Sequence, residues 1–213
     1  EGKILCWFQE QEAQASQWQL LSHKDHLPHP PADPDEAEAQ MFVKDHPNDT
    51  GQPIPRDQWK FARRETAEQE PEPCHVFMES GFQPGRIYEL VYTTRGSRIL
   101  GLGFAAIRDM VSFLKYGSTS EGNPCAGALN RAHAFGQSQS GRFLRTYLYT
   151  GINTDEAGRQ ALDGLIPHVA GGMKGEFNLR FGQPSKDICY VLPGLFPCSD
   201  SLQIDPLTGT GGS

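Results

Sequence analysis

The stretch Arg131–Gly151, RAHAFGQSQSGRFLRTYLYTG, constrains the fold more than any other part of this chain. Ala132–Phe135 is apolar apart from one histidine and is too short for a helix, which predicts a buried strand. From Phe143 onward, apolar residues recur at three- and four-residue spacing, which predicts an amphipathic helix that ends at Gly151. Gly136–Ser140 must therefore connect strand and helix in a very tight turn.

This turn carries Ser138 in the spacing G-x-S-x-G, with Ser140 in place of the second glycine. Such a turn exposes a serine hydroxyl at the start of a helix, where it can attack a carbonyl. It also aims the backbone N–H of Gln139 at the oxyanion that forms, and the helix dipole favours that charge. The pattern predicts a nucleophilic Ser138 with Gln139 as one oxyanion donor. An ordinary loop of small polar residues is the alternative.

The segments around this stretch predict an α/β fold. Ile87–Thr94 is rich in β-branched and aromatic residues and predicts a strand, and Phe104–Tyr116 has one apolar helical face. Leu162–Ala170 predicts a further strand, with Pro167 marking its end. Strand, helix, strand and helix in this order indicate a mostly parallel central sheet flanked by helices.

The remaining chain is divided by composition. Residues 1–36, rich in Gln, Glu, His and Pro, are expected to be a loosely structured arm. Residues 37–62 read as a hairpin-like edge, and residues 74–213 as the core sheet and helices.

Charge and cysteine content exclude several classes of function. The net charge of −7 gives no broad basic surface for nucleic acid or an anionic membrane. No apolar run reaches the length of a membrane span, and no signal peptide is visible, which leaves a cytoplasmic or an exported location open. The five cysteines are odd in number and lack CxxC spacing, so we expect neither a zinc site nor a dithiol redox motif. A serine hydrolase, which the Ser138 pattern favours, implies no organic or metal cofactor. Cys189 and Cys198 are expected to be two separate thiols, with a disulfide as the alternative.

Several longer segments resemble a bacterial family of alpha/beta hydrolase domain proteins. They are IPRDQW at 54–59, GFQPGRIYELVY at 81–92, GLGFAAIRDMVSFL at 101–114, AFGQSQSGRFLR at 134–145 and DGLIPHVAGG at 163–172. FPCSD at 196–200 and DPLTG at 205–209 fit later loops of the family. The elbow form GxSQSGR of this family accounts for Ser140.

The resemblance implies an α/β-hydrolase fold and a serine esterase that forms an acyl-enzyme on Ser138 with a small ester or related acyl substrate. The acid and the histidine of a catalytic triad should follow the serine in that order. His168 is the one histidine after Ser138, and it comes at the end of the next expected strand. The resemblance therefore implies that both partners lie beyond Ser213 and that the chain is a fragment. A non-catalytic binding protein of the same fold is the competing class.

Other polar residues have a structural and a functional interpretation. His168 either lines the pocket, or serves as a substitute base, or is a structural histidine; Arg142 binds a carboxylate of the substrate or forms a structural salt bridge. His133 is expected in the core, and Asp109 on a solvated helix face. Asp200 is a weak candidate for the triad acid. Four aromatic residues are expected to belong to the core rather than to the pocket: Phe104, Phe113, Phe143 and Tyr147.

Overall fold

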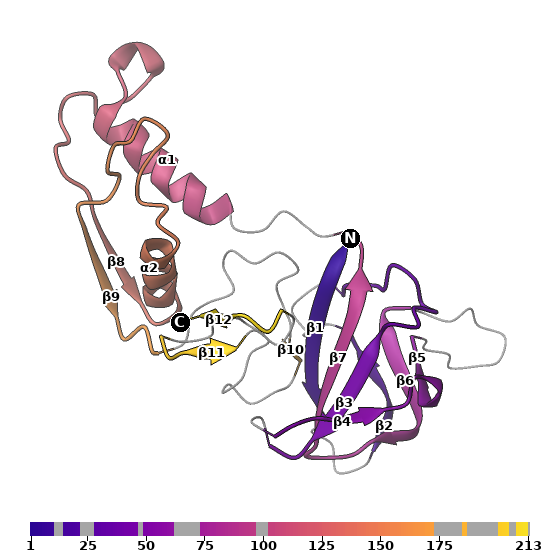
Figure 1. Cartoon of the computed structure of the whole chain (residues 1–213). Helices are drawn as coiled ribbons and strands as arrows, with labels where there is room; N and C mark the ends of the chain where they lie inside the picture. The colour runs from indigo at the N-terminus through magenta and orange to yellow at the C-terminus, as the bar shows by residue number, and fades with distance from the viewer. Residues whose placement is uncertain are drawn as a thin grey trace. The chain divides into compact units, whose positions relative to one another are not determined.

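The computed structural model describes residues 1–10, 15–21, 28–46, 49–61, 73–96, 102–172, 185–186, 200–204 and 208–212. The chain divides into two compact units (Figure 1). The β unit comprises Glu1–Arg98, Gln183–Phe196 and Gln203–Gly212. The serine unit comprises Ile99–Gly182, Pro197–Leu202 and Ser213.

The β unit contains a five-stranded sheet in the order β10-β1-β7-β3-β4. Its strands are β1 (Gly2–Gln9), β3 (Gln40–Lys44), β4 (Gln52–Ile54), β7 (Ile87–Thr94) and β10 (Ser185–Lys186). β1 and β7 are antiparallel over their full lengths, from the Gly2–Thr94 pair to the Gln9–Ile87 pair. β3 is antiparallel to both β7 and β4, and the β1–β10 pair is parallel.

Three other strands form a second sheet in the order β2-β6-β5. These strands are β2 (Ser16–Leu20), β5 (Trp59–Lys60) and β6 (His75–Phe82), with the 3-10 turn η1 (Arg56–Gln58) before β5. β11 (Gln203–Ile204) and β12 (Gly211–Gly212) form a separate antiparallel pair.

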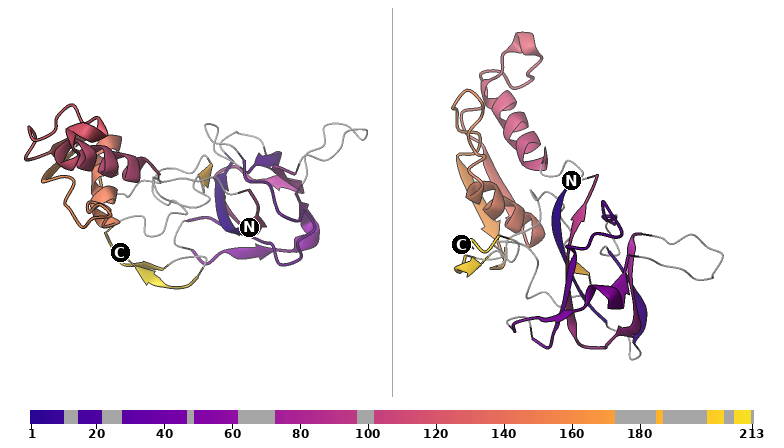
Figure 2. Two further views of the ribbon diagram at one scale, coloured as in Figure 1. Left: turned by 90° about the horizontal axis from the view of Figure 1, so that it is seen from above. Right: turned by 45° about the vertical axis from the view of Figure 1, so that its right-hand side comes forward.

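Aromatic rings from both sheets form the core of the β unit. Phe8 of β1 stacks on Tyr88 of β7 with 5.7 Å between ring centroids, and Phe82 of β6 meets Tyr88 edge-on at 4.9 Å. All three side chains are buried. The strands of the β unit are strongly curved (Figure 2). The ring contacts join β1 and β7 of one sheet to β6 of the other, so burial of large aromatic surfaces holds the sheets together.

The N-terminal segment differs from the expected loose arm. Ile4–Phe8 is buried in β1, and β2 pairs with β6, so the described parts of residues 1–36 belong to the β unit. Burial of the apolar run ILCWF next to β7 offsets the conformational entropy that this segment loses when it becomes a strand. The hairpin of β3 and β4 lies at the edge of the five-stranded sheet, within the segment where the sequence indicated one.

The serine unit has a parallel strand pair with helices on one face (Figure 1). Its elements are α1 (Leu102–Tyr116), η2 (Thr119–Glu121), β8 (His133–Gln137), α2 (Gln139–Tyr149) and β9 (Gly164–His168). β8 and β9 pair from His133–Gly164 to Gln137–His168. Phe104 of α1, Tyr147 of α2 and Leu162 are buried together, and Ala134 and Leu165 of the strands pack against them.

The expected mostly parallel central sheet is not confirmed for the residues that the structure describes. β8–β9 is a parallel pair next to helices, but the five-stranded sheet is mostly antiparallel. The difference comes from β7. The order of elements along the chain predicted that β7, α1 and β8 form a βαβ unit. β7 instead pairs with β1 and β3, and β8 pairs with β9.

Two smaller expectations also need correction. β9 continues through Pro167 to His168. The backbone carbonyl of His168 faces β8, so the neighbouring Pro167, which lacks an N–H, faces the other edge, where no ladder bond to β8 is lost. His133, expected in the core, is exposed on the face of β8 opposite the helices.

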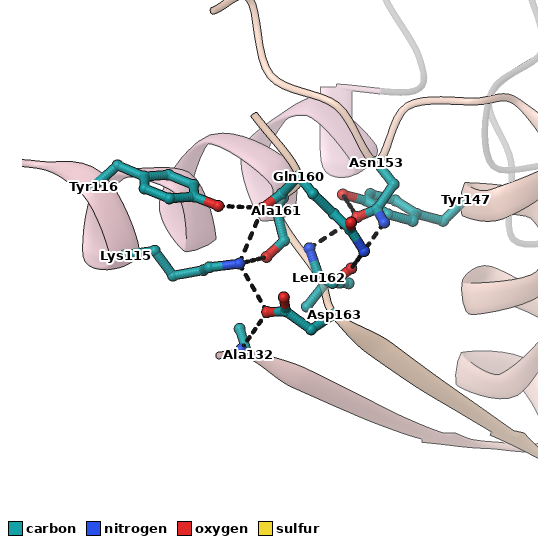
Figure 3. A network of polar contacts seen from close by, with 9 residues as sticks. All are labelled: Lys115, Tyr116, Ala132, Tyr147, Asn153, Gln160, Ala161, Leu162 and Asp163. Carbon is teal, nitrogen blue, oxygen red and sulfur yellow. Dashed lines mark hydrogen bonds and ion pairs between the residues drawn. The ribbon is translucent and has the colours of Figure 1, made fainter. Parts of the chain in front are cut away.

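A polar network fixes the beginning of β8 and β9 (Figure 3). The Lys115 ammonium, whose side chain is 3% exposed, donates to the carbonyl oxygens of Gln160 and Ala161 and to the Asp163 carboxylate at 2.7 Å. The same carboxylate oxygen accepts the Ala132 N–H at 2.8 Å. Burial has the largest single effect and lowers the pKa of Lys115, but hydrogen bonds to Asp163 and Tyr116 and the charge of Asp163 together outweigh it, so the pKa is raised. The network therefore ties α1 to the first residues of both strands.

Candidate active site

The turn between β8 and α2, from Gly136 to Gly141, is called the Ser138 turn below. Ser138 has φ 55° and ψ −116°, a conformation that residues with a side chain rarely adopt. Its N–H donates to the carbonyl of His168 at 3.0 Å, and its own carbonyl accepts the N–H of Arg142 at 2.9 Å. These bonds to β9 and to the first turn of α2 hold the strained backbone in place.

Two glycines are required by the close approach of strand and helix. A Cβ at Gly136 would lie 2.4 Å from the carbonyl oxygen of Ser140. A Cβ at Gly141 would lie 2.8 Å from the carbonyl oxygen of His168 and 3.0 Å from that of Gly136. Both overlaps involve backbone atoms, so a larger residue at either position would force the strand and helix apart.

The hydroxyl of Ser140 closes the turn from within. It donates to the carbonyl of Gln137 at 2.9 Å and accepts the N–H of the same residue at 3.2 Å. The glycine that faces β9 is therefore Gly141, one residue later than in G-x-S-x-G, and Ser140 takes part in the turn through hydrogen bonds to the backbone.

Ser138 and Gln139 lie where the sequence predicted them. Ser138 is exposed at the carboxyl end of β8 and directly precedes α2. Gln139 is the first residue of α2, and the N–H groups of a first helical turn have no acceptor within the helix. An exposed hydroxyl at this position can attack a carbonyl. The N–H groups of the first helical turn and the positive end of the helix can stabilise the resulting oxyanion.

His168 reaches this site through its backbone. It is paired with Gln137, and its carbonyl accepts the Ser138 N–H. Its ring stacks on Phe135 with 6.0 Å between centroids, on the face of the strand pair opposite the helices. Among the residues that the structure describes, no side chain hydrogen bonds to the Ser138 hydroxyl.

The three charged candidates, Arg142, Asp200 and Asp109, lie in different places and make different contacts. Arg142 lies one turn after Ser138, and its guanidinium makes no ion pair within the described ranges, unlike the expected structural salt bridge. Asp200, the weak candidate for the acid, pairs with Arg145, which also donates to the Gly171 carbonyl. Asp109 pairs with the neighbouring Arg108 at 2.6 Å on the exposed face of α1.

Of the four aromatic residues expected in the core, Phe104 and Tyr147 are buried and Phe143 packs against them. Phe113 is half-buried. Cys189 and Cys198 lie outside the described residues.

Sequence reasoning missed Val169, which directly follows β9 and has φ 43°. A β-branched residue is strongly disfavoured in this region, so nothing in the sequence pointed to it. Within the described ranges we find no group of three or more side chains that could hold a metal ion. No described helix is long and apolar enough to cross a membrane.

Comparison with known proteins gives one match. A family model described as "Alpha/beta hydrolase domain" matches residues 55–190, which include the Ser138 turn, both helices and both strands of the serine unit. No curated protein and no solved structure matches this chain. The match spans more than half of the 213 residues, so the chain belongs to the alpha/beta hydrolase domain family.

Proposed function

We propose that the Ser138 turn is a nucleophile elbow and that this protein is a serine hydrolase acting on an ester or a related acyl substrate. One observation carries the proposal: the strained backbone of Ser138 at a strand-to-helix junction that Gly136 and Gly141 keep closely packed. Strain of this kind costs about 1–3 kcal/mol and occurs preferentially at functional sites. Membership of a hydrolase family supports the same conclusion.

The reaction begins when the Ser138 Oγ forms a bond to the carbonyl carbon of the ester. The hydroxyl proton passes to a general base, and the carbonyl oxygen becomes an oxyanion that accepts a hydrogen bond from the Gln139 N–H. The bond to the alcohol then breaks, and the alcohol leaves with the proton from the base. Water attacks the acyl-enzyme, releases the carboxylic acid and restores the Ser138 hydroxyl.

The Ser138 hydroxyl needs a general base that takes up its proton. The order serine, acid, histidine places both partners after Ser138 in the chain. The His168 ring lies against Phe135 on the face opposite the helices, which makes it a poor fit to this role. We therefore keep the proposal that the acid and the histidine come from beyond Ser213.

A fluorophosphonate probe tests the proposal because it reacts with activated serines. On a chain extended past Ser213 we expect one covalent adduct by intact mass, mapped to the peptide containing Ser138 and absent in Ser138→Ala. The 213-residue chain, which would lack the proposed base, should gain no adduct, and labelling of it at Ser138 would place the base within these residues.

Two exposed serines supply the controls. Ser140→Ala removes the hydroxyl that bonds to Gln137, and Ser120→Ala changes a serine of η2. Ser120→Ala should leave the adduct and its rate unchanged, and Ser140→Ala should keep the adduct on Ser138 but gain it more slowly, because the turn loses two hydrogen bonds. A folded, full-length protein that gains no adduct would instead favour a non-catalytic binding protein of this fold.

A further inference from the structure

Two residues with strained backbones lie side by side at the end of the parallel strand pair. Gln137 and His168 are the last paired residues, and each is followed by a non-glycine residue with positive φ, Ser138 at 55° and Val169 at 43°. Adjacent strands are about 4.8 Å apart, so the two residues lie at about this separation. This edge, at the carboxyl ends of parallel strands, is where α/β proteins bind ligands.

The positive φ of Val169 changes which side chain is buried after β9. Val169 is 62% exposed, and the next residue, Ala170, is 7% exposed. The Cβ of Ala170 would lie 3.2 Å from a Cβ built at Gly141. A small residue is therefore buried against the start of α2, and the larger apolar side chain remains exposed next to Ser138.

The segment after Val169 is held in place from α2. Arg145 donates to the Gly171 carbonyl and pairs with Asp200. The strained residue thus lies between two anchors, because the His168 carbonyl accepts the Ser138 N–H on one side and Arg145 binds Gly171 on the other. These hydrogen bonds explain why the backbone on either side of Val169 is fixed. They do not explain why an exposed valine occupies a position with positive φ.

We propose that Val169 contacts the acyl chain of an ester bound at Ser138 and so determines which chain lengths the enzyme accepts. This inference rests on the proposed function and deepens it. An exposed apolar side chain on the residue that neighbours Ser138 across the strand pair gains contact with an acyl chain of more than two carbons and gains little with an acetyl group. The substrate class is therefore a neutral ester with a short to medium aliphatic acyl chain.

The test compares p-nitrophenyl acetate, butyrate and octanoate on the full-length protein. Val169→Ala should lower the kcat/KM for butyrate relative to acetate by about tenfold, since contact with a methylene group is worth about that factor. Val169→Asn should cause a similar loss of preference and raise the Tm by about 2–4 °C, because asparagine tolerates this backbone conformation better. Ile166→Ala is the matched control, as Ile166 is a β-branched residue of β9, the strand that Val169 follows, and is 58% exposed.

The outcomes separate this inference from the proposed function. If the wild type hydrolyses esters and only the Val169 variants change the chain-length ratio, the inference stands. If the wild type is active and the ratio is the same in all variants, Val169 does not contact the acyl chain, and the nucleophile assignment is unaffected. If the wild-type protein neither hydrolyses esters nor is labelled at Ser138, the proposed function fails, and this inference fails with it.

Discussion

Replacing Gly136 by alanine tests whether the Ser138 turn depends on the close approach of β8 and α2. The added Cβ would lie 2.4 Å from the carbonyl oxygen of Ser140, 2.6 Å from its carbonyl carbon and 2.9 Å from the nitrogen of Gly141. No side-chain rotation relieves this overlap, because all three atoms are backbone. Favourable contact begins near 3.5 Å, so the first turn of α2 must move by about 1 Å.

Overpacking costs about 1–3 kcal/mol, and we expect about 3 kcal/mol here because the backbone itself must move. In a chain of this length, each kcal/mol lowers the Tm by about 2–4 °C, which gives a fall of about 6–12 °C. The same movement displaces Ser138 relative to the Gln139 N–H, and a misplacement of about 1 Å lowers a reaction rate by about 100-fold. Thermal unfolding and the rate of fluorophosphonate labelling measure the two effects.

Gly172→Ala is the matched control in the same unit. Its Cβ would have no atom within 4 Å, and its backbone does not have positive φ, so its free energy of unfolding should change by less than about 0.5 kcal/mol. If Gly136→Ala is as stable and as quickly labelled as this control, the reasoning about the turn is refuted.

Three further predictions concern stability and reactivity. Lys115→Met should lower the free energy of unfolding by about 2–3 kcal/mol in urea titrations, because two carbonyl oxygens and a carboxylate lose their buried donor. A change near zero would contradict the role of this network. The hydrogen bond from Ser112 is the main cause that holds the pKa of Asp155 well below its usual range. A depressed pKa contributes stability above about pH 4 that is lost as the pH falls, so Asp155→Asn should flatten the fall of Tm in acid, and an unchanged pH profile would be evidence against this. Burial raises the pKa of the Cys6 thiol to about 12, so iodoacetamide at about pH 8 should modify the half-buried Cys125 and leave Cys6 intact in native protein, as peptide mass mapping would show; early modification of Cys6 would be the contrary result.

The Ser138 turn could be found from the sequence because its signals are local. The strand before it, the small residues within it and the apolar periodicity after it lie within one stretch of chain. The same holds for β7, α1 and β9, whose positions match the expected segments closely. Each of these segments carries its own pattern, so no knowledge of distant partners was needed.

Strand pairing could not be predicted in this way. The apolar run of β1 was visible, but its partner β7 is far away in sequence, with Cys6 opposite Leu90. Neither the pairing nor its antiparallel direction leaves a mark in the alternation of either strand. The spacing of β7, α1 and β8 suggested a parallel unit, and the tertiary pairing of β7 overrode that suggestion.

Details of the candidate site show the same limit. His133 and Phe135 alternate as strand residues should, but the sequence does not say which face of β8 the helices cover. The positive φ of Val169 contradicts the preference of valine, so propensity pointed away from it.

Trapping the acyl-enzyme would test the central claim most directly. The protein is mixed with p-nitrophenyl acetate, quenched in acid within the first turnover and digested for peptide mass mapping. We expect one acetyl group on the peptide that contains Ser138, and none there in Ser138→Ala. An ester that is hydrolysed while the acetyl group appears on another residue, or an unmodified Ser138 during steady turnover, would contradict the assignment of Ser138 as the nucleophile.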